Sequence, residues 1–261
     1  MKSFFRMSYP YILWIALFVV APMIMILLYA LTQDGGNRTL IFRFTLDNFT
    51  KFFSDPTYTR VLLRSLRIAL FTTVFCILIG YPAALFIANL SERWQTMMVL
   101  LLTLPMWINM LLKTYAWRGI LSNFDFGSEV KVFVGMVYDF LPYMIIQIHT
   151  SIAKMDRDLI TAAQDLGANR WKAFLKVTLP LSVPGIISGI TLVFLPAVSS
   201  FVIPNMLGGG DYVLIGNLIE QAFKVTGDWN FGSAISLVMA LIIIASMWAT
   251  KKLDRNAQTE G

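Results

Sequence analysis

The clearest chemical signal in this chain is a carboxylate with aromatic neighbours inside an apolar stretch. Tyr138 directly precedes Asp139, and Tyr143 follows one helical turn later, within the apolar segment 132–150. A charge at bilayer depth costs at least ~2.5 kcal/mol on insertion scales, so it indicates either a function or a nearby counter-charge. A carboxylate beside aromatic faces suits an organic ammonium ion, which gains both charge pairing and cation–π attraction. Two interpretations follow: Asp139 lines a path for a cationic solute, or it pairs with Lys113 in a structural role.

Other polar and aromatic residues are candidates for the same path. Two belong to the apolar stretch 97–117, three follow Pro196, and the others lie beyond them, where they would face an incoming cation. These candidates are Trp107, Asn109, Ser199, Ser200, Phe201, Asp211, Glu220, Asp228 and Trp229. The aromatic members also suit the ordinary belt of aromatic residues at membrane interfaces. Pro196 predicts a helix break near mid-membrane, which is tolerated where the freed backbone faces protein or water.

Catalytic chemistry has little support. Cys76 and His149 are the only cysteine and histidine, and both lie in predicted spans. They therefore predict a packed thiol and an interfacial imidazole rather than a catalytic pair or a metal site. A nucleotide-binding GxxxxGK[ST] loop is also missing, because the glycines 208–210 are followed by Asp211. We expect no catalytic residues, no metal and no cofactor on this chain.

The elements that would position these residues are transmembrane helices. Hydrophobic residues make up 57% of the chain, charged residues only 14%, and the mean hydropathy is +0.68, which excludes an ordinary soluble enzyme. A spanning helix needs about 20 apolar residues. The predicted spans are 9–31, 68–90, 97–117, 132–150, 181–203 and 231–250. They fill most of the chain, so we predict an all-α membrane protein with a single domain, residues 1–261.

Basic residues at the two ends predict the orientation. Six spans place both termini on one side, and Lys2, Arg6, Lys251, Lys252 and Arg255 favour the cytoplasm. The first apolar run is too long for a cleaved signal peptide, so we expect it to be retained. The net charge of +6 suits anionic lipid head groups better than nucleic acid.

Small residues within the spans predict close packing between helices. Gly185 and Gly189 form a GxxxG pair, and Gly80 with Ala84 forms a similar small pair in the second span. Such pairs let helix backbones approach each other closely in membranes.

A polar segment between the fourth and fifth spans has the pattern of a surface helix. Leu159, Ala162, Ala163 and Leu166 recur at i, i+3, i+4 and i+7, and Gly167 is the residue type expected just past a helix end. Asp156 is the predicted N-cap. A second short helix should follow, before Pro180 and Pro184 restart the chain as the fifth span. The segment predicts either a docking element or an interfacial helix lying on lipid.

The same segment resembles the EAA loop of ABC-importer permeases, which reads Glu-Ala-Ala, three residues, Gly, nine residues, Ile, one residue, Leu-Pro. Here Thr161 stands in place of the Glu and Val177 in place of the Ile, at the same spacings. The resemblance implies that a coupling loop, residues 152–180, docks on a cytoplasmic ATPase. The implied coupling residues are Leu159, Thr161, Ala162, Ala163, Asp165, Leu166, Gly167, Ala168, Leu179 and Pro180.

Further strings resemble the spermidine/putrescine permeases of the B type within that superfamily. They are residues 117–121 (WRGIL), 135–138 (GMVY), 184–190 (PGIISGI), 194–197 (FLPA) and 208–210 (GGG). This resemblance implies the six-helix type I importer (MetI-like) permease fold, with both termini cytoplasmic and an importer core of about 58–250. It also implies ATP-driven import of polyamines across the bacterial inner membrane.

The resemblance implies partners as well. They are a second, homologous permease, a cytoplasmic ATPase dimer that holds ATP and Mg²⁺, and an extracytoplasmic polyamine-binding protein. Two alternatives stay open: a permease for another small solute, such as a phosphonate, a metal chelate or another cationic metabolite, or a membrane-embedded enzyme.

Overall fold

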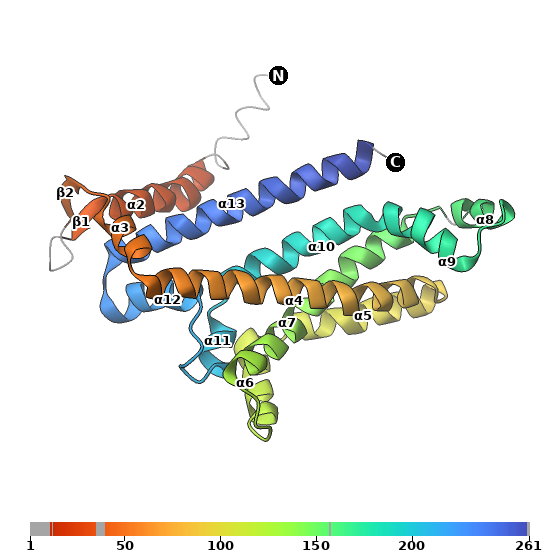
Figure 1. The fold of residues 1–261 in the computed structure, drawn as a ribbon, viewed down its shortest axis with the longest axis horizontal. Coiled ribbons are helices and arrows are strands. Elements are labelled where there is room, and N and C mark those ends of the chain that lie inside the picture. Colours follow the sequence, from red (N-terminus) through yellow and green to blue (C-terminus); the bar gives the residue numbers. More distant parts are fainter. Residues whose placement is uncertain (1–10, 12, 35–39, 157, 260–261) are drawn as a thin grey trace. The chain divides into compact units, whose positions relative to one another are not determined.

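The computed structural model describes residues 11, 13–34, 40–156 and 158–259 (Figure 1). Lys2 and Arg6 lie outside these ranges. The chain divides into two compact units: unit 1 comprises residues 1–61 and 218–242, and unit 2 comprises residues 62–217 and 243–261. In chain order the elements are η1 (Ala16–Val20), α2 (Ala21–Ala30), β1 (Thr32–Asp34), β2 (Leu40–Phe44), α3 (Asp47–Ser54), α4 (Pro56–Ala88), α5 (Glu92–Trp107), α6 (Met110–Leu121), α7 (Ser128–Ala153), α8 (Asp158–Asp165), α9 (Arg170–Ala173), η2 (Phe174–Thr178), α10 (Leu179–Ser199), α11 (Val202–Leu207), α12 (Ile215–Gln221), η3 (Ala222–Thr226) and α13 (Trp229–Thr259).

Five described helical stretches are long and apolar enough to cross a membrane, or six if the bent pair α5 and α6 counts as one span. The five are Leu13–Ala30, Pro56–Ala88, Ser128–Ala153, Arg170–Ser199 and Trp229–Lys252. The predominantly helical membrane architecture predicted from the sequence is therefore confirmed.

The third predicted span is wrong as a single helix. The chain bends by 92° between α5 and α6, and α6 runs away from the line of α5 in Figure 1. Ile108 and Asn109 are extended, and Asn109 Oδ1 accepts a hydrogen bond from Leu111 N at 2.9 Å. This side-chain cap begins a new helix, while Pro105 lacks an N–H group and weakens the last turns of the old one.

The fifth predicted span, 181–203, also differs from the observed helix, both where it begins and where it was predicted to break. Residues 170–199 form one continuous helical stretch, so Pro180 does not restart the chain. A π-helical turn, η2, precedes Pro180; we attribute the tolerance of this proline to the shifted hydrogen-bond register of that turn. The predicted break at Pro196 is wrong as well, because α10 continues to Ser199 and the chain becomes extended at Ser200.

The long connection predicted between the first two spans contains regular secondary structure in its described residues. It contains the antiparallel hairpin β1–β2, helix α3 and the first three turns of α4, which begins well before the predicted residue 68. Asp55 Oδ1 accepts a hydrogen bond from Thr57 N at 2.8 Å and thereby caps α4. This backbone hydrogen bond lowers the pKa of Asp55, because it stabilises the carboxylate form.

Unit 1 is held together by two asparagine side chains at the end of α2. Asn230 Nδ2 donates to the carbonyl oxygens of Tyr29 and Thr32, each at 2.8 Å, and Asn48 Nδ2 donates to Ala30 O at 3.1 Å. The last carbonyl groups of a helix have no partner within the helix, so these amides satisfy groups that would be costly to leave unpaired.

Unit 2 is built around the crossing of α10 and α7, which lie side by side in Figure 1. A Cβ atom at Gly185 would collide with Ser151, and one at Gly189 would collide with the Met144 sulfur. Gly80 brings α4 close to Met144 as well. The close packing predicted from these glycines is confirmed, since each faces a neighbouring helix at a distance that leaves little room for a Cβ atom.

Candidate coupling loop and solute pathway

The polar segment between α7 and α10 begins as predicted. Asp156 Oδ1 accepts a hydrogen bond from Asp158 N at 3.0 Å, at the first residue of α8. Asp158 itself is acidic and lies in the first turn, where it complements the positive end of the helix.

The C-terminus of α8 forms a complete Schellman motif. Ala168 N donates to Ala163 O at 3.0 Å and Gly167 N donates to Gln164 O at 2.9 Å. Gly167 has φ +85°, the left-handed conformation that this motif requires at that position. The spacing between alanine and glycine in the EAA pattern therefore has a local reason, because it closes the helix and turns the chain.

Three of the four residues in the predicted apolar stripe of α8 are exposed. Leu159 is 48% exposed and Leu166 90% exposed, with the exposed Ala162 between them on the same face. Ala163, which belongs to the same helical stripe, is half-buried. Two large exposed apolar side chains flanking an alanine indicate a contact surface.

A cavity of about 640 Å³ lies beneath the coupling loop, bounded by α4, α5, α7, α8 and the stretch 170–178. Its polar lining residues are Asn89, Gln95, Thr161, Gln164, Arg170 and Thr178. The position that is glutamate in the EAA pattern therefore borders a cavity that also contains an arginine. This placement was not expected from the helix pattern.

The remaining coupling candidates lie elsewhere on the loop. Asp165 is exposed and ends α8, while Ala168 is half-buried in the turn. Leu179 and Pro180 begin α10. Nearby, the exposed Trp171 stacks on Phe174 with ring centroids 5.4 Å apart, and Phe174 contacts Tyr81 of α4 at 5.8 Å.

The candidate solute pathway contains a partly buried ion pair. Lys113 Nζ of α6 lies 2.5 Å from Asp139 Oδ1 of α7, and the two side chains are only 12% and 13% exposed. The pairing that the sequence left as an alternative is therefore present. Next to it, the rings of Trp117 and Tyr138 contact each other at 5.0 Å between centroids.

Other pathway candidates lie at breaks in the helices. Trp107, 79% exposed, ends α5, and Asn109 caps α6. Ser199, Ser200 and Phe201 lie at the break between α10 and α11, and the buried Ser200 Oγ has no hydrogen-bond partner in the described part of the chain. Tyr143 is half-buried on α7.

Asn217 is a residue at this break that the sequence did not single out. Its amide Nδ2 donates to Phe201 O at 2.9 Å and to Asn205 Oδ1 at 2.7 Å. Gly216 lies so close to the break that a Cβ atom there would be 2.5 Å from Ser199 O. The available sequence signal was an asparagine that follows a glycine between the apolar residues Ile215 and Leu218.

Most of the residues expected at the outer mouth have structural partners. Glu220 pairs with Lys224 at 3.0 Å, and Asp228 pairs with Lys51 at 3.5 Å. Asp228 Oδ1 also accepts a hydrogen bond from Phe231 N at 2.9 Å, so it caps α13.

Trp229 lies beside Tyr29 and Phe223. Asp211 is exposed, follows the positive-φ turn at Gly209 and Gly210, and belongs to unit 2, whereas the other three mouth candidates belong to unit 1.

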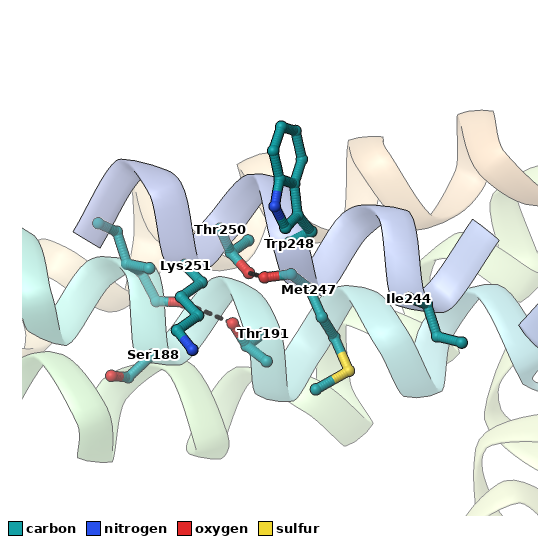
Figure 2. A pocket seen from close by; sticks show the side chains of 8 residues that line it. Ser188, Thr191, Ile244, Met247, Trp248, Thr250 and Lys251 are labelled. Carbon is teal, nitrogen blue, oxygen red and sulfur yellow. Dashed lines mark hydrogen bonds between the residues drawn. The ribbon is translucent and has the colours of Figure 1, made fainter. Parts of the chain in front are cut away.

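A groove of about 500 Å³ between α10 and the last part of α13 is shown in Figure 2. The Lys251 amine points towards Ser188 and Thr191 across the groove. Thr191 Oγ1 donates to Ile187 O at 3.0 Å, so its hydroxyl hydrogen is already used within its own helix.

The described residues contain no cluster of three or more histidine, cysteine or acidic side chains that would hold a metal ion.

This arrangement of helices is the fold of ABC-importer permeases. It is similar to a chain of a bacterial ABC transporter that imports the acidic polysaccharide alginate, with a TM-score of 0.77, 17% identity and coverage of 98% of this chain and 96% of that chain. It is also similar to a chain of the MetNI methionine ABC transporter, with a TM-score of 0.62, 14% identity and coverage of 76% and 95%.

Residues 2–258 match the family of binding-protein-dependent transport system inner membrane components, and the chain belongs to that family. It is 37% identical over 270 residues to the spermidine/putrescine permease PotB of Haemophilus influenzae, covering 95% of this chain and 94% of the relative. It is 36% identical to PotB of Escherichia coli K12, covering 95% and 98%. The predictions of a transport permease and of a multi-pass protein in the bacterial inner membrane are confirmed.

Proposed function

We propose that this chain is the permease subunit of an ATP-driven importer for polyamines. The observation that carries the proposal is 36–37% identity over nearly the whole chain to proteins named as spermidine/putrescine permeases. The fold alone does not select the cargo, because similar folds import alginate and methionine.

The proposed architecture is one permease domain, residues 1–261, with an importer core of about 58–250. It has six spans if α5 and α6 together cross the membrane once, and both termini lie in the cytoplasm. The coupling loop, 152–180, then faces the cytoplasm, where the exposed Leu159 and Leu166 contact a groove of an ATPase subunit. Closure of the ATPase dimer moves α7 and α10 through α8.

The proposed partners are a second, homologous permease, a cytoplasmic ATPase dimer and an extracytoplasmic polyamine-binding protein. The similar alginate transporter was solved in complex with a periplasmic protein, which supports a binding protein as the donor of solute. ATP and Mg²⁺ reside on the ATPase, and this chain holds no cofactor.

In the proposed pathway Asp139 provides the negative charge for an ammonium group, with Trp117 and Tyr138 as nearby aromatic faces. Ser200 and its neighbours at the α10–α11 break provide hydroxyl and carbonyl oxygens that can accept hydrogen bonds from the ammonium groups of the solute. Glu220 and Asp228 of unit 1 have lysine partners, which offset the charge of each carboxylate.

Uptake of labelled spermidine and putrescine by the complete complex in proteoliposomes tests this function. We expect ATP-dependent uptake, and we expect Asp139→Asn to reduce kcat/KM by at least about tenfold, equivalent to ~1.4 kcal/mol. Asp125→Asn, which changes an exposed carboxylate in the loop 122–127, is the matched control and should transport normally. An assembled complex without polyamine uptake would disprove the cargo, whereas normal uptake by Asp139→Asn would remove only that residue from the pathway.

A further inference from the structure

The ion pair between Lys113 and Asp139 has an unusual setting for a purely structural contact. Lys113 lies in the first turn of α6, a helix with no acidic residue in that turn. The N-terminus of a helix carries partial positive charge, so an ammonium group there is disfavoured by its own helix and depends on Asp139 of α7. The counter-charge of Lys113 is therefore supplied by a carboxylate on another helix.

Asp139 has capacity for a second cation. Only Oδ1 contacts Lys113, and Oδ2 has no hydrogen-bond partner within the described residues. The Asp139 side chain is 13% exposed, and an unpaired carboxylate oxygen on it is open to an incoming N–H donor. The aromatic pair Trp117 and Tyr138 comes from the same two helices: Trp117 lies one turn after Lys113, and Tyr138 directly precedes Asp139.

We propose that Lys113 is a resident counter-ion, which occupies the cation site at Asp139 until an ammonium group of the solute displaces it. This inference rests on the proposed function. The empty site stays neutral, because a carboxylate this far buried is costly without a partner. A solute ammonium first contacts the available Oδ2 and then replaces the lysine at Oδ1, so Lys113 sets how strongly a cation must compete.

A structural ion pair predicts a different pattern. If the pair only fastens α6 to α7, removing either charge harms assembly, and removing both restores it in part. If Lys113 competes with the solute, its removal instead strengthens solute binding. The two cases differ in the sign of the change in KM.

The experiment measures KM for labelled putrescine in the complete, reconstituted complex, for the wild type, Lys113→Gln, Asp139→Asn and the double variant. We expect Lys113→Gln to lower KM about three- to tenfold, equivalent to ~0.6–1.4 kcal/mol. We expect Asp139→Asn to have the highest KM, because the unpaired lysine repels the solute. The double variant should have a lower KM than Asp139→Asn and a higher KM than the wild type. Lys113→Arg keeps the charge and should stay within about twofold of the wild type.

An unchanged or higher KM for an assembled Lys113→Gln complex overturns the inference. If Lys113→Gln does not assemble, KM is instead compared between Asp139→Asn and the double variant. The double variant has no unpaired charge at this site. A lower KM in the double variant supports competition, whereas better assembly with the same KM overturns it. Failure of the wild-type complex to transport polyamines would contradict the proposed function instead, so the two failures are distinguishable.

Discussion

Buried charge and backbone conformation decide the properties of individual residues here. Asp139 and Lys113 are tolerated in an apolar setting because they neutralise each other at 2.5 Å. Gly167 has a different requirement. No atom lies within 4 Å of the Cβ position that a side chain would occupy, so no neighbouring group excludes a side chain there. The need for glycine comes from its φ of +85° alone.

Gly167→Ala should therefore loosen the end of α8 without any steric clash. The left-handed conformation costs a non-glycine residue about 1–2 kcal/mol, so the Ala163–Ala168 hydrogen bond should open more often. Hydrogen–deuterium exchange of residues 162–168 should become about tenfold faster. Gly119→Ala, within α6 and also without close neighbours, is the control. Unchanged exchange in this segment would refute the conformational argument.

At the scale of elements, unit 2 depends on the close approach of α10 to α7. Gly185 faces the Ser151 side chain and the backbone oxygen of Gln147, which cannot move away easily. Gly189 faces the flexible end of Met144. The two glycines lie one turn apart on the same helix, but the neighbours of Gly185 are the more rigid.

Gly185→Ala should accordingly be more destabilising than Gly189→Ala. Overpacking of this kind costs about 1–3 kcal/mol, so the thermal unfolding midpoint in detergent should fall by several degrees. The methionine side chain can shift, so Gly189→Ala should cause a smaller decrease. The exposed Ser188 on the same helix provides the control, Ser188→Ala, which should leave the midpoint unchanged. Equal effects at the two glycines would show that the difference between their neighbours is unimportant.

At the scale of the whole molecule, the proposed coupling loop presents exposed apolar side chains. Leu166 is 90% exposed at the end of α8, and Leu159 and Ala162 lie on the same face. Ala163, at the centre of the sequence motif, is half-buried and belongs to the Schellman turn. The docking surface is thus best tested at Ala162.

Ala162→Trp should leave insertion and folding of the permease intact but prevent the ATPase from docking. We expect ATP-driven uptake to fall at least about tenfold and the ATPase to be lost during purification of the complex. Ala21→Trp adds the same bulk on an exposed face of the first span and should have no effect. Normal uptake together with normal copurification in Ala162→Trp would exclude this face as the ATPase contact.

Several features could be predicted from the sequence because they depend on neighbouring residues. The spans at 132–150 and 231–250 follow from continuous apolar runs, and α8 follows from its period, its cap at Asp156 and its final glycine. The bend at Asn109 and the helix through Pro196 could not be predicted in the same way. A proline or an asparagine permits several local structures, and packing selects one of them.

By itself, the sequence determined the membrane class, the location of most spans and the coupling-loop pattern, since hydropathy and short-range spacing are local properties. Only the tertiary structure decided that Lys113 is the partner of Asp139, that α5 and α6 form an angle of 92°, and that Thr161 borders a cavity. The physical reason is distance along the chain: ion pairs, bends and cavities depend on groups that the sequence keeps apart and that folding brings together.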